Sequence, residues 1–317
     1  MEEQIFYSPE DVIAANLRET ALQIGALTEQ EIAHLSELAI EIVSGDVDSP
    51  ELIASLPDHR PPHFPLPSLP QNAEMIARLQ RQTAIWKSVM LCTELRRLLS
   101  DEHALSPDRF FSEQEELDET AKNRVVYQRN SYADNAFLRF AKHLDTPLRA
   151  LYAGGFTGVC EEVYNGSCEY AILPIENSAE GPLNSFTRLI DRYGLKIAAT
   201  CDVPTADGSR ITRFALLRRT LSLLQPSFQN DLFFEFIAPL QGEPSIIDVL
   251  AAAHCCGLQL SRLDTRAPSE ENSHLPAERV VLHTNRGDLY AYLLYLAMEL
   301  PQYTPVGIYP HLTEDQS

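Results

Sequence analysis

The sequence predicts an α/β protein that has a helical N-terminal region, an α/β layer and a C-terminal βαββαβ unit. Three observations support this fold class. From residue 124 onward, short apolar runs alternate with amphipathic helical segments, which is typical of a mostly parallel sheet covered by helices. From residue 231 the pattern restarts as strand, helix, two strands, helix and strand, a ferredoxin-like arrangement. Before residue 122 the apolar residues recur at helical spacing.

Composition limits the class of protein. The chain has 317 residues and 44% hydrophobic content, enough for two or three domains with real cores. Its formal net charge of −20 argues against nucleic-acid and anionic-membrane partners, because both repel an acidic surface. No apolar run has membrane-spanning length, and the first residues lack the pattern of a secretion signal. We therefore expect a cytoplasmic protein whose six cysteines are reduced, lie in the core and bind no metal.

The first third of the sequence is predicted to contain three segments. Residues 1–56 form an acidic helical segment, with a helix start at Ser8 and a capping box that begins at Thr28. Residues 57–71 form a linker, because six prolines exclude a continuous helix. Residues 72–122 form a helical region that begins with a long helix. We find no catalytic pattern in this third.

The candidate site lies at the ends of two predicted strands. One apolar run leads directly into Glu176, Asn177 and Ser178, and a second, over residues 210–217, carries Thr212. Ligands of α/β sheets bind beyond the carboxyl ends of strands, so these side chains are candidates for holding a small polar substrate. The alternative is that they cap helices and close turns.

Several short motifs follow one another in a recognisable order, although each is weak alone. They are Val125-Val126-Tyr127-Gln128, Val163-Tyr164-Asn165-Gly166, the run from Tyr170 to Ser178 with Gly181, Thr212-Arg213-Phe214, Thr265-Arg266-Ala267-Pro268 and Gly307-Ile308-Tyr309-Pro310. With this order, residues 124–312 resemble prephenate dehydratase with its C-terminal ACT domain.

The resemblance implies an activity and its residues. Prephenate would lose carbon dioxide and water to give phenylpyruvate, in phenylalanine biosynthesis, by a carbon–oxygen lyase that needs no cofactor. Thr212 would be the catalytic residue, in contact with the leaving hydroxyl. The substrate-binding residues would be Glu176, Asn177, Ser178, Arg213 and Phe214. For Arg213 two roles are open, an anion partner or a structural ion pair with an acid such as Glu176.

The resemblance also implies a domain organisation. Residues 123–222 would form a single periplasmic-binding-like α/β lobe, and residues 228–317 an ACT-like domain. The ACT domain would bind an aromatic amino-acid effector and join copies into a homo-oligomer. Its regulatory residues would be Ser245, Ile246, Asp264, Thr265 and Arg266.

One departure from the family bears on activity. The family places a second lobe between its two central motifs and forms the active site between the lobes. Here residues 179–211 hold one helix and one strand, so a single lobe would exclude water poorly.

Three functional hypotheses stay open. The first is a divergent prephenate dehydratase. The second is a non-catalytic member, a pseudoenzyme that acts as a binding or regulatory protein of aromatic amino-acid metabolism. The third is a chorismate mutase-like N-terminal module. It is the weakest, because Arg18 is the only arginine or lysine in residues 1–56 and a dicarboxylate needs several cations.

Overall fold

The structure is a computed structural model, and its chain divides into two compact units, Met1–His103 and Ala104–Ser317. It describes residues 26, 29–37, 39–40, 73–99, 117–144, 147–221, 223–224, 231–239, 245–266, 277–284, 287–300 and 303–313. The predicted helix start at Ser8 and the predicted linker at 57–71 lie outside these residues. In the described part, no helix combines the length and the apolar character needed to cross a membrane.

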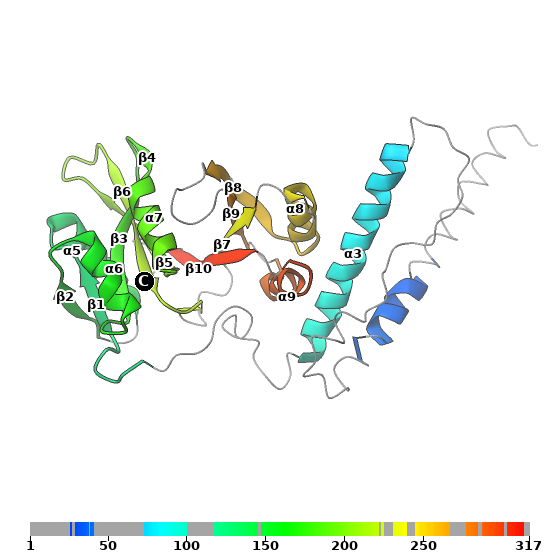
Figure 1. Cartoon of the computed structure of the whole chain (residues 1–317), viewed down its shortest axis with the longest axis horizontal. Helices are drawn as coiled ribbons and strands as arrows, with labels where there is room; N and C mark the ends of the chain where they lie inside the picture. Colours follow the sequence, from blue (N-terminus) through cyan, green and yellow to red (C-terminus); the bar gives the residue numbers. More distant parts are fainter. Residues whose placement is uncertain are drawn as a thin grey trace, which may run out of the picture. The chain divides into compact units, whose positions relative to one another are not determined.

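The N-terminal unit contains α3 (Ala73–Leu99), the long helix predicted at the start of residues 72–122, and a shorter helical run at residues 29–37 (Figure 1). The buried side chains of α3 include Ile85, Val89, Cys92 and Leu95, at helical spacing. Lys87 Nζ of α3 lies 2.7 Å from Glu31 Oε1 of the shorter run. At least one acid of the acidic segment is therefore part of an ion pair within this unit.

The C-terminal unit is built on one sheet of ten strands (Figure 1). The strands are β1 (Arg124–Tyr127), β2 (Arg149–Tyr152), β3 (Tyr170–Asn177), β4 (Gly181–Pro182), β5 (Lys196–Pro204), β6 (Ile211–Arg218), β7 (Leu232–Pro239), β8 (Gln259–Arg266), β9 (Ala277–His283) and β10 (Thr304–Leu312). Their order is β2-β1-β3-β6-β5-β10-β7-β9-β8, and β4 pairs with β3. All strands predicted from residue 124 onward are present.

Helices cover both faces of the first part of this sheet. They are α5 (Ser131–His143), α6 (Phe156–Tyr164) and α7 (Asn184–Arg192). The buried side chains of α5 belong to one core cluster, with Phe140 and Phe214, and those of α6 and α7 belong to another, with Val163 and Ile190. Right-handed crossovers place α5 and α6 on opposite faces, because β1 leads outward to β2 and β2 leads back to β3. We call these the α5 face and the α7 face.

The prediction of a mostly parallel sheet is correct for only some of the strands. β1 runs parallel to β2 and β3, whereas β6 runs antiparallel to both β3 and β5. β5 and β6 form a hairpin closed by a hydrogen bond from Thr205 N to Arg210 O (2.8 Å). Between β3 and β6 the chain therefore forms only α7 and strands that belong to this same sheet.

The predicted βαββαβ order is also present, from β7 through α8 (Ile246–Cys255), β8, β9 and α9 (Leu289–Glu299) to β10. Neighbours in the order β10-β7-β9-β8 are all antiparallel. Tyr292 of α9 contacts the rings of Phe234 and Phe236 in β7. Since successive strand residues point to opposite faces, Phe233 and Glu235 point away from α9.

β10 joins the two parts of the sheet. It pairs in parallel with β5 and antiparallel with β7, so residues of the predicted lobe and of the predicted ACT-like domain share one sheet. Gly307 of β10 lies opposite Ile197 of β5, where a Cβ atom on residue 307 would come within 2.6 Å of the Ile197 carbonyl oxygen. The close approach of these strands therefore requires glycine.

Candidate functional site

The two strand motifs are neighbours, but their side chains divide between the faces of the sheet. Glu176 of β3 pairs with Arg213 of β6, and Asn177 pairs with Thr212. Phe214 packs in the core cluster of the α5 face, and Thr212 shares a pocket with it. Arg213 lines another pocket, together with residues of α7. Adjacent strand residues thus send the predicted catalytic hydroxyl and the predicted cation in opposite directions.

The Thr212 pocket has a volume of about 240 Å³ and lies near the carboxyl ends of β1 and β3. Its polar lining residues are Gln128, Asn130, Tyr132 and Thr212, and the rest of the lining, Phe214 included, is apolar. No charged side chain lines it among the described residues. Asn130 is occupied as the N-cap of α5, where its side chain accepts a hydrogen bond from Ala133 N (2.9 Å).

Asn177 and Ser178 close the end of β3. Asn177 Oδ1 accepts a hydrogen bond from Ala179 N (2.9 Å), and Ser178 Oγ accepts one from Ile211 N (2.9 Å). These contacts match the alternative of turn-closing residues. The structure therefore does not bring Glu176, Asn177, Ser178 and Thr212 into one pocket.

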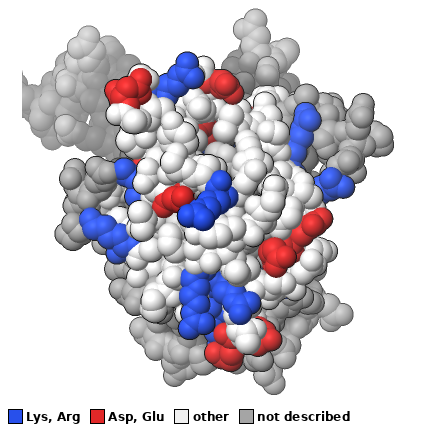
Figure 2. Space-filling model, turned by 90° about the vertical axis from the view of Figure 1, so that its left-hand side faces the viewer, with Lys and Arg blue, Asp and Glu red and all other residues white. Residues whose placement is uncertain are grey.

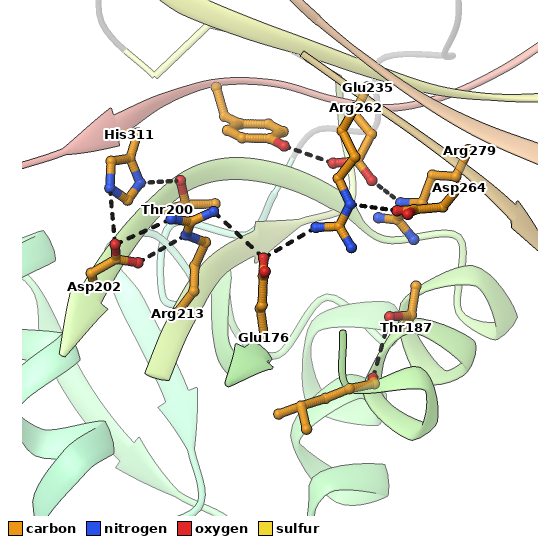
Figure 3. Close-up of polar contacts among 12 residues, drawn as sticks. Glu176, Thr187, Thr200, Asp202, Arg213, Glu235, Arg262, Asp264, Arg279 and His311 are labelled. Atoms are coloured by element: carbon orange, nitrogen blue, oxygen red, sulfur yellow. Dashed lines mark hydrogen bonds and ion pairs between the residues drawn. The ribbon is translucent and has the colours of Figure 1, made fainter. Parts of the chain in front are cut away.

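A larger pocket of about 430 Å³ lies on the opposite side of β6, and we call it the arginine pocket (Figure 3). Its lining includes three arginines, Arg213, Arg262 and Arg279. Two groups of predicted residues meet here, because Glu176 and Arg213 line it together with Asp264 and Thr265 of β8. The remaining predicted regulatory residues lie at element ends. Ser245 is the N-cap of α8, Ile246 is its first residue, and Arg266 is the last residue of β8.

Arg213 is held mainly by Asp202 of β5. Its Nε and Nη2 donate to the two carboxylate oxygens of Asp202 at 2.8 and 3.1 Å, while Nη1 lies 3.5 Å from Glu176 Oε2. His311 Nε2 lies 3.4 Å from Asp202 Oδ2. Burial opposes ionisation of Asp202, but the hydrogen bonds from His311 and Arg213 outweigh it and hold the pKa of this carboxyl well below its usual range. Arg213 thus forms an ion pair whose first partner is Asp202, and its role toward an anionic ligand stays a prediction.

Arg262 connects β8 to β3. Its Nη1 donates to Glu176 Oε2 at 3.1 Å, and its Nε lies 2.5 Å from Asp264 Oδ2 (Figure 3). Glu176, Arg262 and Asp264 are all partly exposed to solvent, with 31%, 33% and 40% of the side chain accessible. The predicted substrate-binding Glu176 and the predicted regulatory Asp264 are therefore linked through one arginine.

The deepest charged group is a triad on the α7 face. Arg279 Nε contacts Glu235 Oε1, and the hydroxyl of Tyr309 donates to Glu235 Oε2 at 2.7 Å (Figure 3). Burial raises the pKa of Tyr309 to about 12 and lowers the pKa of Arg279. Both oxygens of the buried Glu235 side chain are therefore in contact with a donor.

Sequence reasoning missed five of these residues: Asp202, Glu235, Arg262, Arg279 and His311. The signal for Glu235 was available, since a single acid inside the apolar run of β7 requires a buried partner. The others needed the register of strands far apart in the sequence.

Among the described residues, neither potential metal ligands nor cysteines form a second candidate site. Among the described residues, no three histidine, cysteine or acidic side chains cluster as a metal ion would require. Five cysteines are buried, but Cys255 is exposed, so the prediction that all six lie in the core is wrong for this one. Cys255 is the last residue of α8.

Charge is mixed on the face of the molecule shown in Figure 2. Blue basic and red acidic side chains are interspersed there among uncharged residues. The net charge of −20 therefore does not produce a surface of a single sign on this face.

Comparison with known proteins agrees with the sequence motifs. Residues 128–208 match the family model described as prephenate dehydratase. The chain contains a prephenate dehydratase-like segment. The resemblance inferred from the motifs is thereby confirmed for a stretch that begins just after β1 and ends in the β5–β6 hairpin, before Thr212. No curated protein matches the chain by sequence.

Solved structures that are similar to this chain include prephenate dehydratases. The enzyme from Streptococcus mutans has 16% identity and a TM-score of 0.47, with 60% of this chain and 99% of that chain covered. The enzyme from Arthrobacter aurescens in complex with L-Phe has 15% identity and a TM-score of 0.44, over 59% and 90%. A structure described as a novel type of quorum quenching acylase, GqqA, has 19% identity and a TM-score of 0.43, with 60% of this chain and 95% of that chain covered.

Proposed function

We propose that this chain is a non-catalytic prephenate dehydratase-like protein, which acts as a small-molecule-binding or regulatory protein of aromatic amino-acid metabolism. The match over residues 128–208 supports the family part of the proposal. One observation carries the non-catalytic part. The Thr212 pocket has no charged lining residue in the described chain, while Arg213 lies in the other pocket.

The missing charge matters because prephenate carries two carboxylates. An enzyme that dehydrates it has to position both of them against a proton donor, and carboxylates are held by arginine or lysine. Among the described residues that line the Thr212 pocket, none is an arginine or a lysine that could hold a carboxylate. The β5–β6 hairpin further supports the proposal, since the described residues between β3 and β6 provide no opposing wall that would exclude water from Thr212.

The test is a turnover assay on the purified full chain, with its folding checked by circular dichroism. We expect no phenylpyruvate from prephenate above the uncatalysed background. Thr212→Val serves as the active-site variant and Ser209→Ala, in the exposed hairpin loop, as its control. Turnover that disappears in Thr212→Val and persists in Ser209→Ala would refute the proposal.

Prephenate dehydration is the second candidate, because the Thr212 hydroxyl does line a pocket together with Gln128 and Tyr132. For this function a second copy of the chain would have to supply the cations. The activity should then rise with protein concentration as dimers form, which turnover measured alongside analytical ultracentrifugation would show.

A further inference from the structure

The arginine pocket contains a buried cation with unused hydrogen-bonding capacity. Only 10% of the Arg279 side chain is exposed, and its Nε contacts Glu235. Nη1 has no hydrogen-bond partner in the described part of the chain, and its distance to Asp191 Oδ1 is 3.9 Å. A guanidinium has five N–H donors, and a buried donor without an acceptor is destabilising. This arrangement favours an acceptor supplied by a ligand.

The carboxylates of the same pocket are already paired. Glu176 accepts from Arg262 and lies near Arg213, and Asp264 is bound by Arg262. Both oxygens of Glu235 are in contact with donors. An ammonium group on the ligand would compete with the arginines for these carboxylates, whereas an acceptor on the ligand could use Arg279 Nη1, which has no hydrogen-bond partner in the described part of the chain. The unpartnered donor of Arg279 therefore favours a ligand that carries an acceptor, such as an anion.

The uncharged walls indicate the rest of the ligand. Ile175, Phe233 and Val281 provide apolar surface within the same volume of about 430 Å³. Small-molecule sites have volumes of roughly 300–1,000 Å³ and combine apolar walls with a few convergent polar groups. A simple inorganic anion would leave these apolar walls without contacts.

We propose that the arginine pocket binds a small organic carboxylate with an apolar body and no ammonium group, whose carboxylate is held by Arg279 and Arg262. The planar guanidinium fork matches the two oxygens of a carboxylate. This inference rests on the proposed function as a binding protein and names its ligand class. Because the pocket is lined by β3 and β6 on one side and by β8 and β9 on the other, the ligand would contact both parts of the sheet.

Isothermal titration calorimetry of the full chain tests the ligand class, with benzoate as the probe. We expect saturable binding of benzoate, with benzamide and inorganic phosphate at least about tenfold weaker. L-phenylalanine should also bind more weakly than benzoate, because its ammonium meets paired carboxylates. No saturable binding of benzoate up to about 10 mM, or tighter binding of L-phenylalanine, would overturn the proposal.

Two arginine variants test the location. Arg262→Lys and Arg279→Lys keep the charge but remove the fork, and each should weaken benzoate about tenfold. Arg279→Lys also loses the contact with the buried Glu235, so this variant could affect folding. The Arg262 side chain is one third exposed, so Arg262→Lys tests binding with less effect on folding. The control is Arg210→Lys in the exposed hairpin loop, which should bind like the wild type. Equal affinity of all three variants would contradict the assignment.

The outcomes separate the two proposals. Prephenate turnover together with benzoate binding would refute only the non-catalytic function. Absence of both turnover and benzoate binding would refute only the carboxylate site.

Discussion

Asp202 and Arg213 face each other across the β5–β6 hairpin and share two hydrogen bonds, at 2.8 and 3.1 Å. The pair fixes Arg213 on the α7 face of the sheet, away from Thr212. It also makes the hairpin sensitive to pH, because the pKa of Asp202 in the folded chain lies well below its usual range.

Asp202→Asn should destabilise the chain at neutral pH. We expect a loss of about 1 kcal/mol in the free energy of unfolding, a modest value because about a third of each partner is exposed. Because the pKa of Asp202 is lower in the folded chain than in the unfolded chain, the ionised carboxylate stabilises the fold at pH values above the unfolded pKa of about 4. This stabilisation is lost as the pH falls toward the folded pKa. The difference between wild type and variant, measured by urea unfolding, should therefore be smaller at about pH 3 than at about pH 7. An equal difference at both pH values would show that the charge of Asp202 does not matter.

Gly307→Ala should disrupt the joint between β10 and β5. The added Cβ would lie 2.6 Å from the Ile197 carbonyl oxygen and 2.8 Å from the Ile197 Cβ, so the strands would have to separate. Overpacking of this kind costs about 1–3 kcal/mol, which thermal unfolding would detect as a lower Tm.

Gly154→Ala is the matched control for this substitution, since nothing lies within 4 Å of its added Cβ. It should leave the Tm close to that of the wild type. A similar Tm for both variants would mean that the two strands are not in close contact.

Ser245→Ala should weaken the start of α8. Ser245 Oγ accepts from Asp248 N at 3.4 Å, and Asp248 Oδ2 accepts from Ser245 N at 3.1 Å, which forms a capping box. Removal of such a cap costs about 1 kcal/mol, whereas Ser245→Asn should retain most of it. Urea unfolding of both variants distinguishes this structural role from the predicted regulatory one. If Ser245→Ala were as stable as the wild type, the cap would not contribute.

Thiol labelling should separate the cysteines into two classes. Cys255 is exposed, while burial raises the pKa of Cys160, Cys201 and Cys256 to about 12, which suppresses the reactive thiolate. A thiol reagent such as DTNB should modify one cysteine in the native protein at neutral pH and the others only after unfolding. The fast phase should be absent in Cys255→Ser, and a fast phase that persists there would mean that a buried cysteine is accessible.

Much of the fold was predictable because its signals are local. The helices α8 and α9 begin after Ser245 and Asp288, whose side chains accept hydrogen bonds from backbone groups of the first turn. The strands of the βαββαβ unit are apolar runs separated by turn signals, and their order follows from few possible connections. The length of α3 was readable from its continuous helical spacing.

The site was less predictable, because it depends on which face each strand residue occupies. Thr212 and Arg213 belong to one motif, yet period-two alternation sends them into different pockets. The contact between Arg262 and Glu176 joins residues that are 86 positions apart, and no local pattern encodes that register. The antiparallel course of β6 was missed for the same reason.

The position of β10 has a consequence for the order in which the chain is made. Lys196 Nζ at the start of β5 bonds to the Pro305 carbonyl of β10, 109 residues later, and β10 lies inside the sheet rather than at its edge. During synthesis, β5 would present an unpaired edge until residues 304–312 leave the ribosome. A fragment that ends near residue 222 would expose this edge permanently, so it would be a poor choice for expression as a separate domain.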